Sequence, residues 1–410
     1  MIEGIRTLDD MEVGGKTVLL RIDINSPIDS DKKIKDNTRI RRSIRTIEEL
    51  SDKGARTVIL AHQADPLDYH NFTCLAEHAV ILQRLLGKPV EYIDDVVGPA
   101  ARQAITRLEN GQILLLENIR IHTEETIIFE KELKLSPRVQ AGTILVKKLA
   151  PLADIYLCDA FACVHRSQPS LVGFPEVLQS GCGRLFEEEL SVIAQVMKKP
   201  KRPCLFILGG AKILDAFSMM EKVLANGSAD KVLTCGLAGQ IMLKALGYAL
   251  GSPTETLIKD KNLEKFVEPA QKILDCFRDR VLCPEDVAVD LEGQRQNLDI
   301  SSLPADGLIK DIGEQTMNRY GRLISEAGTV FMNGPAGVYE DEVFGLGTKT
   351  IWEKVADSNA FSVIGGGDTI AAAKRFKVDK KISYICTAGG GLVLFLSGKK
   401  LPVIEALKNR

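Results

Sequence analysis

Short apolar runs alternate with longer amphipathic stretches along the chain. Two stretches in the first half, residues 39–54 and 73–88, carry apolar side chains at helical spacing and have glycine at or next to their ends. The apolar runs around them are typical of buried strands: residues 16–24, 55–62, 112–119 and 153–161. Strands that alternate with helices favour a mostly parallel sheet covered on both faces. We therefore predict an α/β domain of this kind.

The second half repeats the alternation, and its strands share one feature. Each apolar run ends in glycine just before a predicted helix, as in "CLFILGG", "KVLTCG", "GTVFMNG", "AFSVIGGG" and "SYICTAGGG". The predicted helices lie near residues 213–225, 236–248, 312–327, 348–358 and 369–376. Open parallel sheets bind ligands at the carboxyl ends of their strands, which is where these glycines lie.

Length and linker composition indicate two domains. A chain of 410 residues exceeds the size at which one hydrophobic core usually keeps growing. The charged stretch 186–203 is typical of a helix that runs into a Lys/Pro linker. We predict two doubly wound parallel-sheet domains, residues 1–182 and 201–392, joined by an interdomain helix at 183–200. The tail 393–410 ends the chain and could pack on either domain.

Composition excludes several classes of partner. The formal net charge of −2 provides no broad field for nucleic acid or an anionic membrane. No apolar run is long enough to span a bilayer, and the start of the chain lacks a secretory signal. The nine cysteines are scattered and without metal-site spacing, so we expect reduced core residues of a cytoplasmic protein. We expect neither a nucleic-acid nor a membrane partner.

The glycine clusters of the second half predict a phosphate site. Glycine-rich turns from strand to helix present backbone N–H groups and helix N-termini, which suit phosphate. One such cluster alone would more often be a tight turn, but four in one domain favour a shared site. Neither GxGxxG nor GxxxxGK[ST] is present. Lys212 can supply a positive charge, and Asp368 can hold Mg²⁺ or cap its helix.

The first half presents a different set of side chains after its strands. Arginine binds phosphate and carboxylate with two parallel hydrogen bonds, so arginines grouped with a histidine and an amide suit a small, multiply charged anion. A lone His62 would more often be a core histidine, and the other arginines of 39–45 belong to a solvated helix face. The candidate residues are Asp23, Asn25, Arg39, His62, Arg120 and Arg166.

One domain is thus suited to bind an extended phosphate chain, and the other to bind a compact anion. This combination indicates phosphoryl transfer, in which positioning and charge neutralisation carry most of the catalysis. Closure of two lobes would exclude water, which otherwise accepts the phosphoryl group. Two alternatives remain: a kinase acting on another small acid, and a two-lobed nucleotide-binding protein without turnover.

Seven motifs in order resemble those of the phosphoglycerate kinase family over essentially the whole chain. They are "RIDINSP", "LLLENIR", "DAFACVHRSQPSLVGF", "ILGGAK", "MNGPAGVYE", "VIGGGDT" and "TAGGG". The wording "RSQPSLVGF" is most similar to the archaeal branch. The resemblance implies reversible, direct in-line phosphoryl transfer between 1,3-bisphosphoglycerate with MgADP and 3-phosphoglycerate with MgATP, in glycolysis and gluconeogenesis. It also implies hinge bending, and a C-terminal tail that returns to the N-terminal domain. We expect a monomer.

The resemblance also assigns roles to individual residues. Phosphoglycerate would be bound by Asp23, Asn25, Arg39, His62, Arg120 and Arg166. The nucleotide would be bound by Gly209, Gly210, Lys212, Gly236, Asn333, Gly334, Glu340, Gly365, Gly366, Gly367, Asp368 and Thr369. Transfer itself would depend on Arg39, Lys212, Gly366 and Gly390, and Asp368 would hold Mg²⁺.

Two positions depart from the family pattern. Ala216 stands where many bacterial and eukaryotic members carry a second lysine. Archaeal-type members often lack this lysine, so the branch of the family explains the alanine. Asp65 stands three residues after His62, where the family usually has arginine or lysine that helps to hold the substrate phosphate. An acid near a phosphate is unfavourable, by about a few kcal/mol if unscreened. Either Asp65 turns away and its neighbours compensate, or the substrate site is altered.

Overall fold

The first half of the chain forms a six-stranded parallel sheet. Its central strands are four that the sequence predicts, and all their residues except Arg56 are buried because both faces of the sheet are covered. The edge strands were not predicted, because three or four residues such as "EYI" and "QSGC" form no apolar run. The order across the sheet is β3 (Glu91–Ile93), β4 (Ile113–Leu116), β2 (Arg56–Leu60), β1 (Thr17–Arg21), β5 (Ile155–Cys158) and β6 (Gln179–Cys182).

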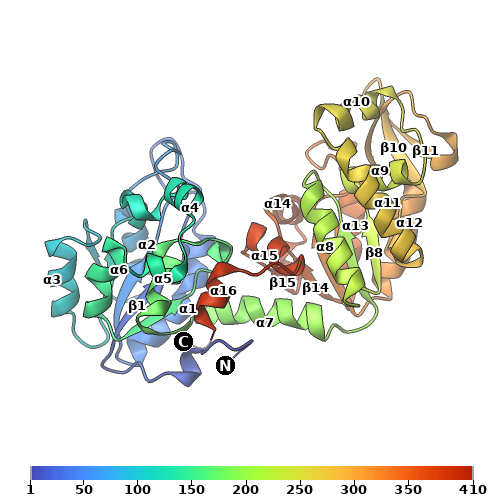
Figure 1. The fold of residues 1–410 in the computed structure, drawn as a ribbon. Coiled ribbons are helices and arrows are strands. Elements are labelled where there is room, and N and C mark those ends of the chain that lie inside the picture. The colour runs from blue at the N-terminus through green and yellow to red at the C-terminus, as the bar shows by residue number, and fades with distance from the viewer. Residues whose placement is uncertain (1, 409–410) are drawn as a thin grey trace. The chain divides into compact units, whose positions relative to one another are not determined.

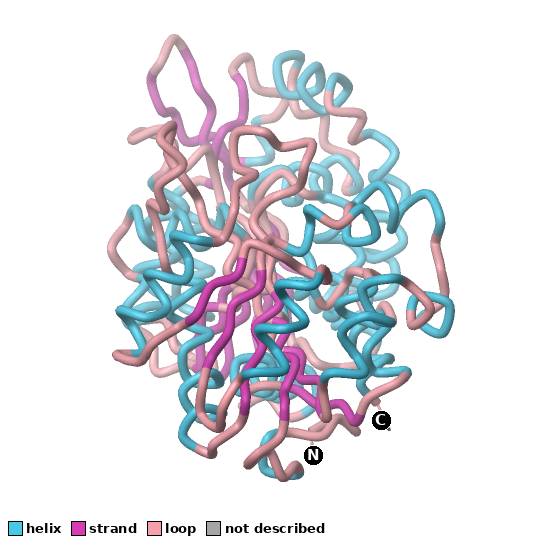
Figure 2. Tube along the Cα trace, turned by 90° about the vertical axis from the view of Figure 1, so that its left-hand side faces the viewer, coloured by secondary structure: helices cyan, strands magenta, loops and turns pink. Residues whose placement is uncertain are grey.

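Helices flank this sheet on both sides, as Figure 2 shows for the strands nearest the viewer. The two helices predicted from apolar spacing are α1 (Thr38–Asp52) and α2 (Ala76–Leu86), which pack against each other. Four further helices follow: α3 (Pro99–Arg107), α4 (Ile127–Leu133), α5 (Pro137–Gln140) and α6 (Ile144–Leu149).

The second half forms another parallel sheet of six strands. Its order is β15 (Tyr384–Ile385), β14 (Phe361–Ile364), β13 (Thr329–Asn333), β7 (Cys204–Leu208), β8 (Lys231–Thr234) and β9 (Val281–Leu282). The predicted helices are present as α8 (Ile213–Ala225), α9 (Gly236–Ala245), α12 (Glu314–Ser325), α13 (Leu346–Asp357) and α14 (Gly367–Arg375). Three helices were not predicted: α10 (Ser252–Asp260), α11 (Val267–Phe277) and α15 (Gly389–Leu396).

A small antiparallel sheet in the second half was also not predicted. Its order is β11 (Gln294–Asp299), β10 (Asp286–Leu291) and β12 (Leu308–Ile312). The segment "QRQNLD" of β11 is largely polar and mostly exposed, so it carries no apolar signal. Its partner β10 is buried over its first four residues, because it also pairs with β12 and packs against α12.

Figure 1 traces these elements in the computed structural model, which describes residues 2–408. Within them the chain divides into two compact units. Unit 1 holds the residues up to Ser191 and those from Lys400 on, and unit 2 holds Val192–Lys399. Each unit has its own apolar core. Two parallel-sheet α/β domains confirm the predicted fold class.

Two helices lie at the ends of these units. Helix α7 (Arg184–Lys198) contains the division between them. Its first residue, Arg184, is held in unit 1 by ion pairs to Asp9 (2.5 Å) and Glu49 (2.7 Å). The last helix, α16 (Pro402–Leu407), packs in unit 1, whereas the apolar side chains of α15 are buried in unit 2 against α8. The tail therefore joins unit 1 from Lys400 on.

Candidate active site

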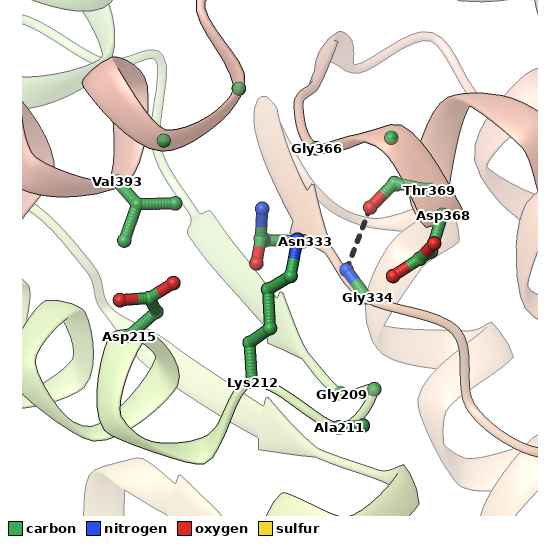
Figure 3. A pocket seen from close by; sticks show the side chains of 14 residues that line it. Gly209, Ala211, Lys212, Asp215, Asn333, Gly334, Gly366, Asp368, Thr369 and Val393 are labelled. Carbon is green, nitrogen blue, oxygen red and sulfur yellow. Dashed lines mark hydrogen bonds between the residues drawn. The ribbon is translucent and has the colours of Figure 1, made fainter. Parts of the chain in front are cut away.

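A pocket in unit 2 collects the glycine-rich strand ends. Figure 3 shows it between the turns after β7, β13 and β14 and the beginning of α15. Every strand that contributes ends at the same edge of one parallel sheet, which is why motifs far apart in the sequence meet here. The lining residues are Gly209, Gly210, Ala211, Lys212, Asp215, Asn333, Gly334, Gly366, Gly367, Asp368, Thr369, Gly389, Gly390 and Val393.

Some of these glycines are required by neighbouring protein atoms. A Cβ on Gly209 would overlap the carbonyl oxygen of Pro335, and one on Gly334 would overlap the carbonyl of Gly209. Gly334 also has a positive φ of 88°, which side chains rarely adopt. The two turns are joined by a hydrogen bond from the Gly209 N–H to the carbonyl of Asn333 (2.9 Å). Close approach of backbone to backbone therefore explains these glycines.

Two other glycines have no such explanation. A Cβ on Gly367 or on Gly390 would meet no atom of the chain within 4 Å, and neither residue has a positive φ. The fold would therefore accept side chains at both positions. Each lies near the beginning of a helix, α14 or α15, where N–H groups have no partner within the helix. Their missing side chains leave space for a ligand that contacts the backbone.

The polar side chains of the pocket suit phosphate and one metal ion. Lys212 lies among the turns in Figure 3, and Thr369 accepts a hydrogen bond from the Gly334 N–H through Oγ1 (2.7 Å). Asp368 presents one carboxylate beside the glycine turn after β14. Mg²⁺ is typically bound by one or two carboxylates together with phosphate oxygens, so this single carboxylate fits. Asp215 and Val393 also line the pocket, and the sequence analysis did not select them.

Three residues predicted to bind nucleotide do not line this pocket. Gly365 is turned toward Leu392, and its carbonyl accepts from Asn333 Nδ2 (2.8 Å). Gly236 begins α9 with a φ of 54° beside the backbone of Gly210. Glu340 lies on the loop after β13, and its carbonyl accepts from Arg375.

A second cluster follows the strands of unit 1 and is rich in guanidinium groups. Asp23 and His62 are buried, and the Arg39 side chain, which is 39% exposed, forms an ion pair with Asp23 (2.6 Å). Burial lowers the pKa of His62 well below its usual range, and nearby arginines lower it further. The arginines that act on His62 are Arg120, Arg21, Arg166 and Arg39. The cluster is therefore strongly electropositive.

Arg120 carries donors that no protein group satisfies. Its side chain is 3% exposed, and its Nη1 donates to the carbonyl of Ala64. Its Nε and Nη2 are buried and have no hydrogen-bond partner. Unpaired donors on a buried charge are costly, unless a ligand supplies the acceptors. Arg120 therefore indicates an anion site here.

Asp65 accepts hydrogen bonds from two backbone groups, and its charge also acts on Arg120. Its Oδ1 accepts from the Leu67 N–H (3.2 Å), and its Oδ2 accepts from the N–H of Ile127, the first residue of α4 (3.3 Å). Further along α4, Glu130 pairs with Arg166 (3.4 Å) and accepts from the Ser167 N–H (2.7 Å). The acid that replaces the expected basic residue thus anchors the helix that holds Arg166.

The structure brings all six predicted phosphoglycerate residues into unit 1. Asn25, the one predicted substrate-binding residue not yet described, accepts from the Ala64 N–H through Oδ1 (3.0 Å). This bond links the turns after β1 and β2. One residue of the cluster was missed. Arg21 is fully buried in β1 and contacts His62, and the only signal for it was a charge inside the apolar run "TVLLRIDI".

The cluster also holds a possible set of metal ligands. Asp23, His62 and Cys163 place ligand atoms within 4.8 Å of one another. Four guanidinium groups surround His62, however, and they repel a cation. Asp23 is already paired with Arg39. The electrostatics therefore favour an anion over a metal ion at this place.

Other observations bear on the whole chain. None of the helices in the described part of the chain is long and apolar enough to cross a lipid bilayer. Six of the nine cysteines are buried, as the expected core residues would be, whereas Cys74 and Cys276 are exposed.

Comparisons with known proteins agree along nearly the whole length. The family described as "Phosphoglycerate kinase" matches residues 8–399. The phosphoglycerate kinase of Methanothermus fervidus is 44% identical over 404 residues, which cover 98% of this chain and 97% of that protein. The enzyme of Methanobacterium bryantii is 46% identical over 402 residues, covering 98% of this chain and 96% of its own. The crystal structure of phosphoglycerate kinase from Pyrococcus horikoshii has a TM-score of 0.85 at 38% identity and covers 98% of both chains.

Proposed function

Because the chain belongs to the phosphoglycerate kinase family, it is a phosphotransferase, and we propose that it transfers a phosphoryl group reversibly between 1,3-bisphosphoglycerate with ADP and 3-phosphoglycerate with ATP. The observation that carries this proposal is the pairing of two chemistries in one chain. Unit 2 has a pocket lined by bare backbone, and unit 1 has a buried guanidinium with unpaired donors.

The proposed phosphoglycerate site is the arginine cluster of unit 1. The two unpaired donors of Arg120 suit the oxygens of a phosphate, since guanidinium binds phosphate in bidentate fashion. His62 would add a hydrogen bond, and Arg166 could exchange its 3.4 Å contact with Glu130 for the incoming anion. Asp23 and Asn25 would orient the substrate from the turn after β1.

The proposed nucleotide site is the glycine pocket of unit 2. The open space beside Gly367 and Gly390 would let a phosphate chain lie against the backbone at the beginnings of α14 and α15. Lys212 would neutralise part of the phosphate charge. We propose that Asp368 would hold Mg²⁺, which would neutralise part of the phosphate charge when bound. Gly236 and Glu340 would contact the nucleoside, outside this pocket.

Transfer would be direct and in line, with no phosphorylated enzyme. Arg39 is the most exposed basic residue of the proposed phosphoglycerate site. It lies in the first turn of α1 and contacts Asp23. We propose that it stabilises the charge that develops on the moving phosphoryl group. Donor and acceptor must come within bonding distance, so we also propose that the chain bends during turnover, which would exclude water.

A coupled assay tests the proposal. Purified protein with MgATP and 3-phosphoglycerate should produce 1,3-bisphosphoglycerate, followed by the NADH that a dehydrogenase consumes. Omitting 3-phosphoglycerate, or replacing Mg²⁺ with a chelator, should abolish the signal. No turnover at saturating substrates would reject the proposal and favour a protein that binds nucleotide only.

The alternative of another small acid as substrate is less favoured. It depended on Asp65, whose carboxylate is used by two backbone N–H groups. A panel of small phosphorylated and unphosphorylated acids in the same assay would identify a different preference.

A further inference from the structure

Arg21 is an arginine buried inside a β-strand, with no exposed surface. Its three nitrogens each face a different acceptor. Nε donates to the hydroxyl oxygen of Ser170 (3.1 Å), Nη1 donates to the carbonyl of Ile22, and Nη2 lies 3.1 Å from Nδ1 of His62. The guanidinium is rigid and planar, so these bonds fix its orientation against the imidazole.

A buried acid holds Arg21 from the other side. The Ser170 hydroxyl accepts from Arg21 and therefore donates its own hydrogen to Oε2 of Glu125 (2.7 Å). Oε1 of Glu125 accepts from the Ser170 N–H (2.6 Å). Glu125 and Ser170 are fully buried, so no water competes for these bonds. The result is a buried chain of hydrogen bonds, Glu125–Ser170–Arg21–His62, although burial raises the pKa of Glu125 to about 7, so this acid is partly protonated at neutral pH.

The chemistry of arginine decides the state of the histidine. Guanidinium only donates hydrogen bonds, so Nδ1 of His62 must accept and cannot carry a proton. We propose that Arg21, oriented by Ser170 and Glu125, is a positioning residue that keeps His62 neutral with its proton on Nε2. This nitrogen is then the donor that His62 can offer to an anionic ligand.

The surroundings of His62 support the neutral state. Burial is the largest cause of its lowered pKa, and the positive groups around it act in the same direction. Asp23 is the acidic group nearby, and it is paired with Arg39. The titratable and charged groups that face His62 are Asp23, Cys163, Arg21, Arg39, Arg120 and Arg166.

The neutral state assigned to His62 adds detail to the proposed function. It depends on that function only for the identity of the ligand. The arginines would supply all the positive charge for the phosphoglycerate, and His62 would supply one directed N–H. Its contribution to binding would then stay constant through the range near pH 6.5 in which a free imidazole titrates.

The tautomer can be measured directly on the full chain. We suggest ¹⁵N labelling of the five histidines, long-range ¹H–¹⁵N spectra near pH 7 without substrate, and assignment of His62 by His62→Gln. The expected result is a protonated Nε2, an unprotonated Nδ1, and no protonation of the ring down to pH 6. A proton on Nδ1, or a cationic ring at pH 6.5, would overturn the proposal. Because no substrate is present, a failure of the coupled assay would leave this result standing.

A variant tests the buried chain. Ser170→Ala removes the acceptor of Arg21 Nε, so His62 should become a mixture of tautomers. The KM for 3-phosphoglycerate should rise on the order of fivefold, the equivalent of about one hydrogen bond, with a smaller change in kcat. Ser228→Ala is the matched control, since Ser228 is buried in unit 2 and donates to the carbonyl of Met197.

The control should leave both the tautomer and the KM unchanged. An unchanged tautomer in Ser170→Ala would overturn the role assigned to Ser170. If that variant does not fold, Arg21→Met gives the second test, because a thioether has no hydrogen to donate to Nδ1 of His62. A mixed tautomer is again expected, and a pure Nε2–H form would count against Arg21.

Discussion

At the scale of single residues, glycine does two different things in the unit 2 pocket. Gly209 and Gly334 lack side chains because the backbone of a neighbouring turn occupies the space. Gly367 and Gly390 lack them although the space beside each is open. The first pair serves the fold, and we propose that the second pair serves the ligand.

This difference predicts opposite effects of alanine. Gly390→Ala should leave the free energy of unfolding within about 0.5 kcal/mol, because it creates no clash, while activity falls at least tenfold. Gly334→Ala should lower the free energy of unfolding by more than 1 kcal/mol, since alanine is strained at positive φ and would overlap Gly209. Denaturant unfolding and the coupled assay measure both. Full activity in Gly390→Ala would contradict the ligand role.

Asp159 provides a residue-scale prediction for pH. It follows β5 and is fully buried beside the beginning of α7, where Oδ1 accepts from the Phe186 N–H (2.9 Å). Burial raises its pKa from 3.8 to about 7. Between about pH 4 and pH 7 the folded state therefore binds a proton that the unfolded state does not, so stability from this group falls as pH rises.

Asp159→Asn should remove this dependence. The variant keeps an acceptor for Phe186 and carries no titrating proton. Its free energy of unfolding relative to the parent protein should increase between pH 4.5 and pH 7.5, by on the order of a few kcal/mol. Denaturant unfolding followed by circular dichroism measures this. Parallel pH profiles for the two proteins would show that Asp159 is ionised in the folded state.

At the scale of elements, the short helix α4 supports the anion site by holding Arg166 in place. None of its residues is buried, so packing does little to hold it. Its first N–H is held by Asp65, and its Glu130 holds Arg166 and the backbone of Ser167. Polar contacts at the first residue and in the middle of α4 thus replace a hydrophobic face.

Asp65→Ala should therefore weaken phosphoglycerate binding. Loss of two partly buried hydrogen bonds to backbone, one of them to Ile127, would loosen the first turn of α4 and with it Arg166. We expect the KM for 3-phosphoglycerate to rise severalfold, with little change in the KM for ATP. Asp68→Ala is the matched control on the same loop, since its carboxylate accepts from the side chain of half-buried Asn71 and not from α4 in the described part of the chain. Tighter binding in Asp65→Ala would show that the acid opposes the substrate.

At the scale of the whole molecule, the presence of two separate cores means that the stability of each unit can be measured separately. Each unit has its own buried apolar cluster, and the proposed nucleotide site lies in unit 2 alone. The single tryptophan, Trp352, is fully buried in the core of unit 2. Its fluorescence therefore reports one unit, whereas circular dichroism reports both.

The two substrates should stabilise different units. A ligand at 100 times its Kd stabilises the unit it binds by about 2.7 kcal/mol. MgATP should therefore move the Trp352 unfolding transition to higher denaturant, and 3-phosphoglycerate alone should move it much less. Lys212→Ala should reduce the shift with MgATP. Equal shifts with either ligand would show that the units unfold as one.

The predictable part of the fold was the part with strong local signals. Central strands such as β1 and β7 are continuous apolar runs, and α8 begins and ends where its pattern predicts. Edge strands such as β3 and the polar strand β11 were missed, because their side chains are only partly buried and their sequences carry no apolar pattern.

The sequence by itself determined the architecture, the family and most of the residues that gather at the two sites, because strand periodicity and strand-end motifs are local properties of the chain. Only the tertiary structure decided what each residue does there. It showed that Asp65 bonds to backbone, that Arg21 faces His62, and that open space lies beside Gly367. The two contacts join residues far apart in the chain, and the open space depends on how distant segments pack. Packing rather than local sequence therefore decides all three.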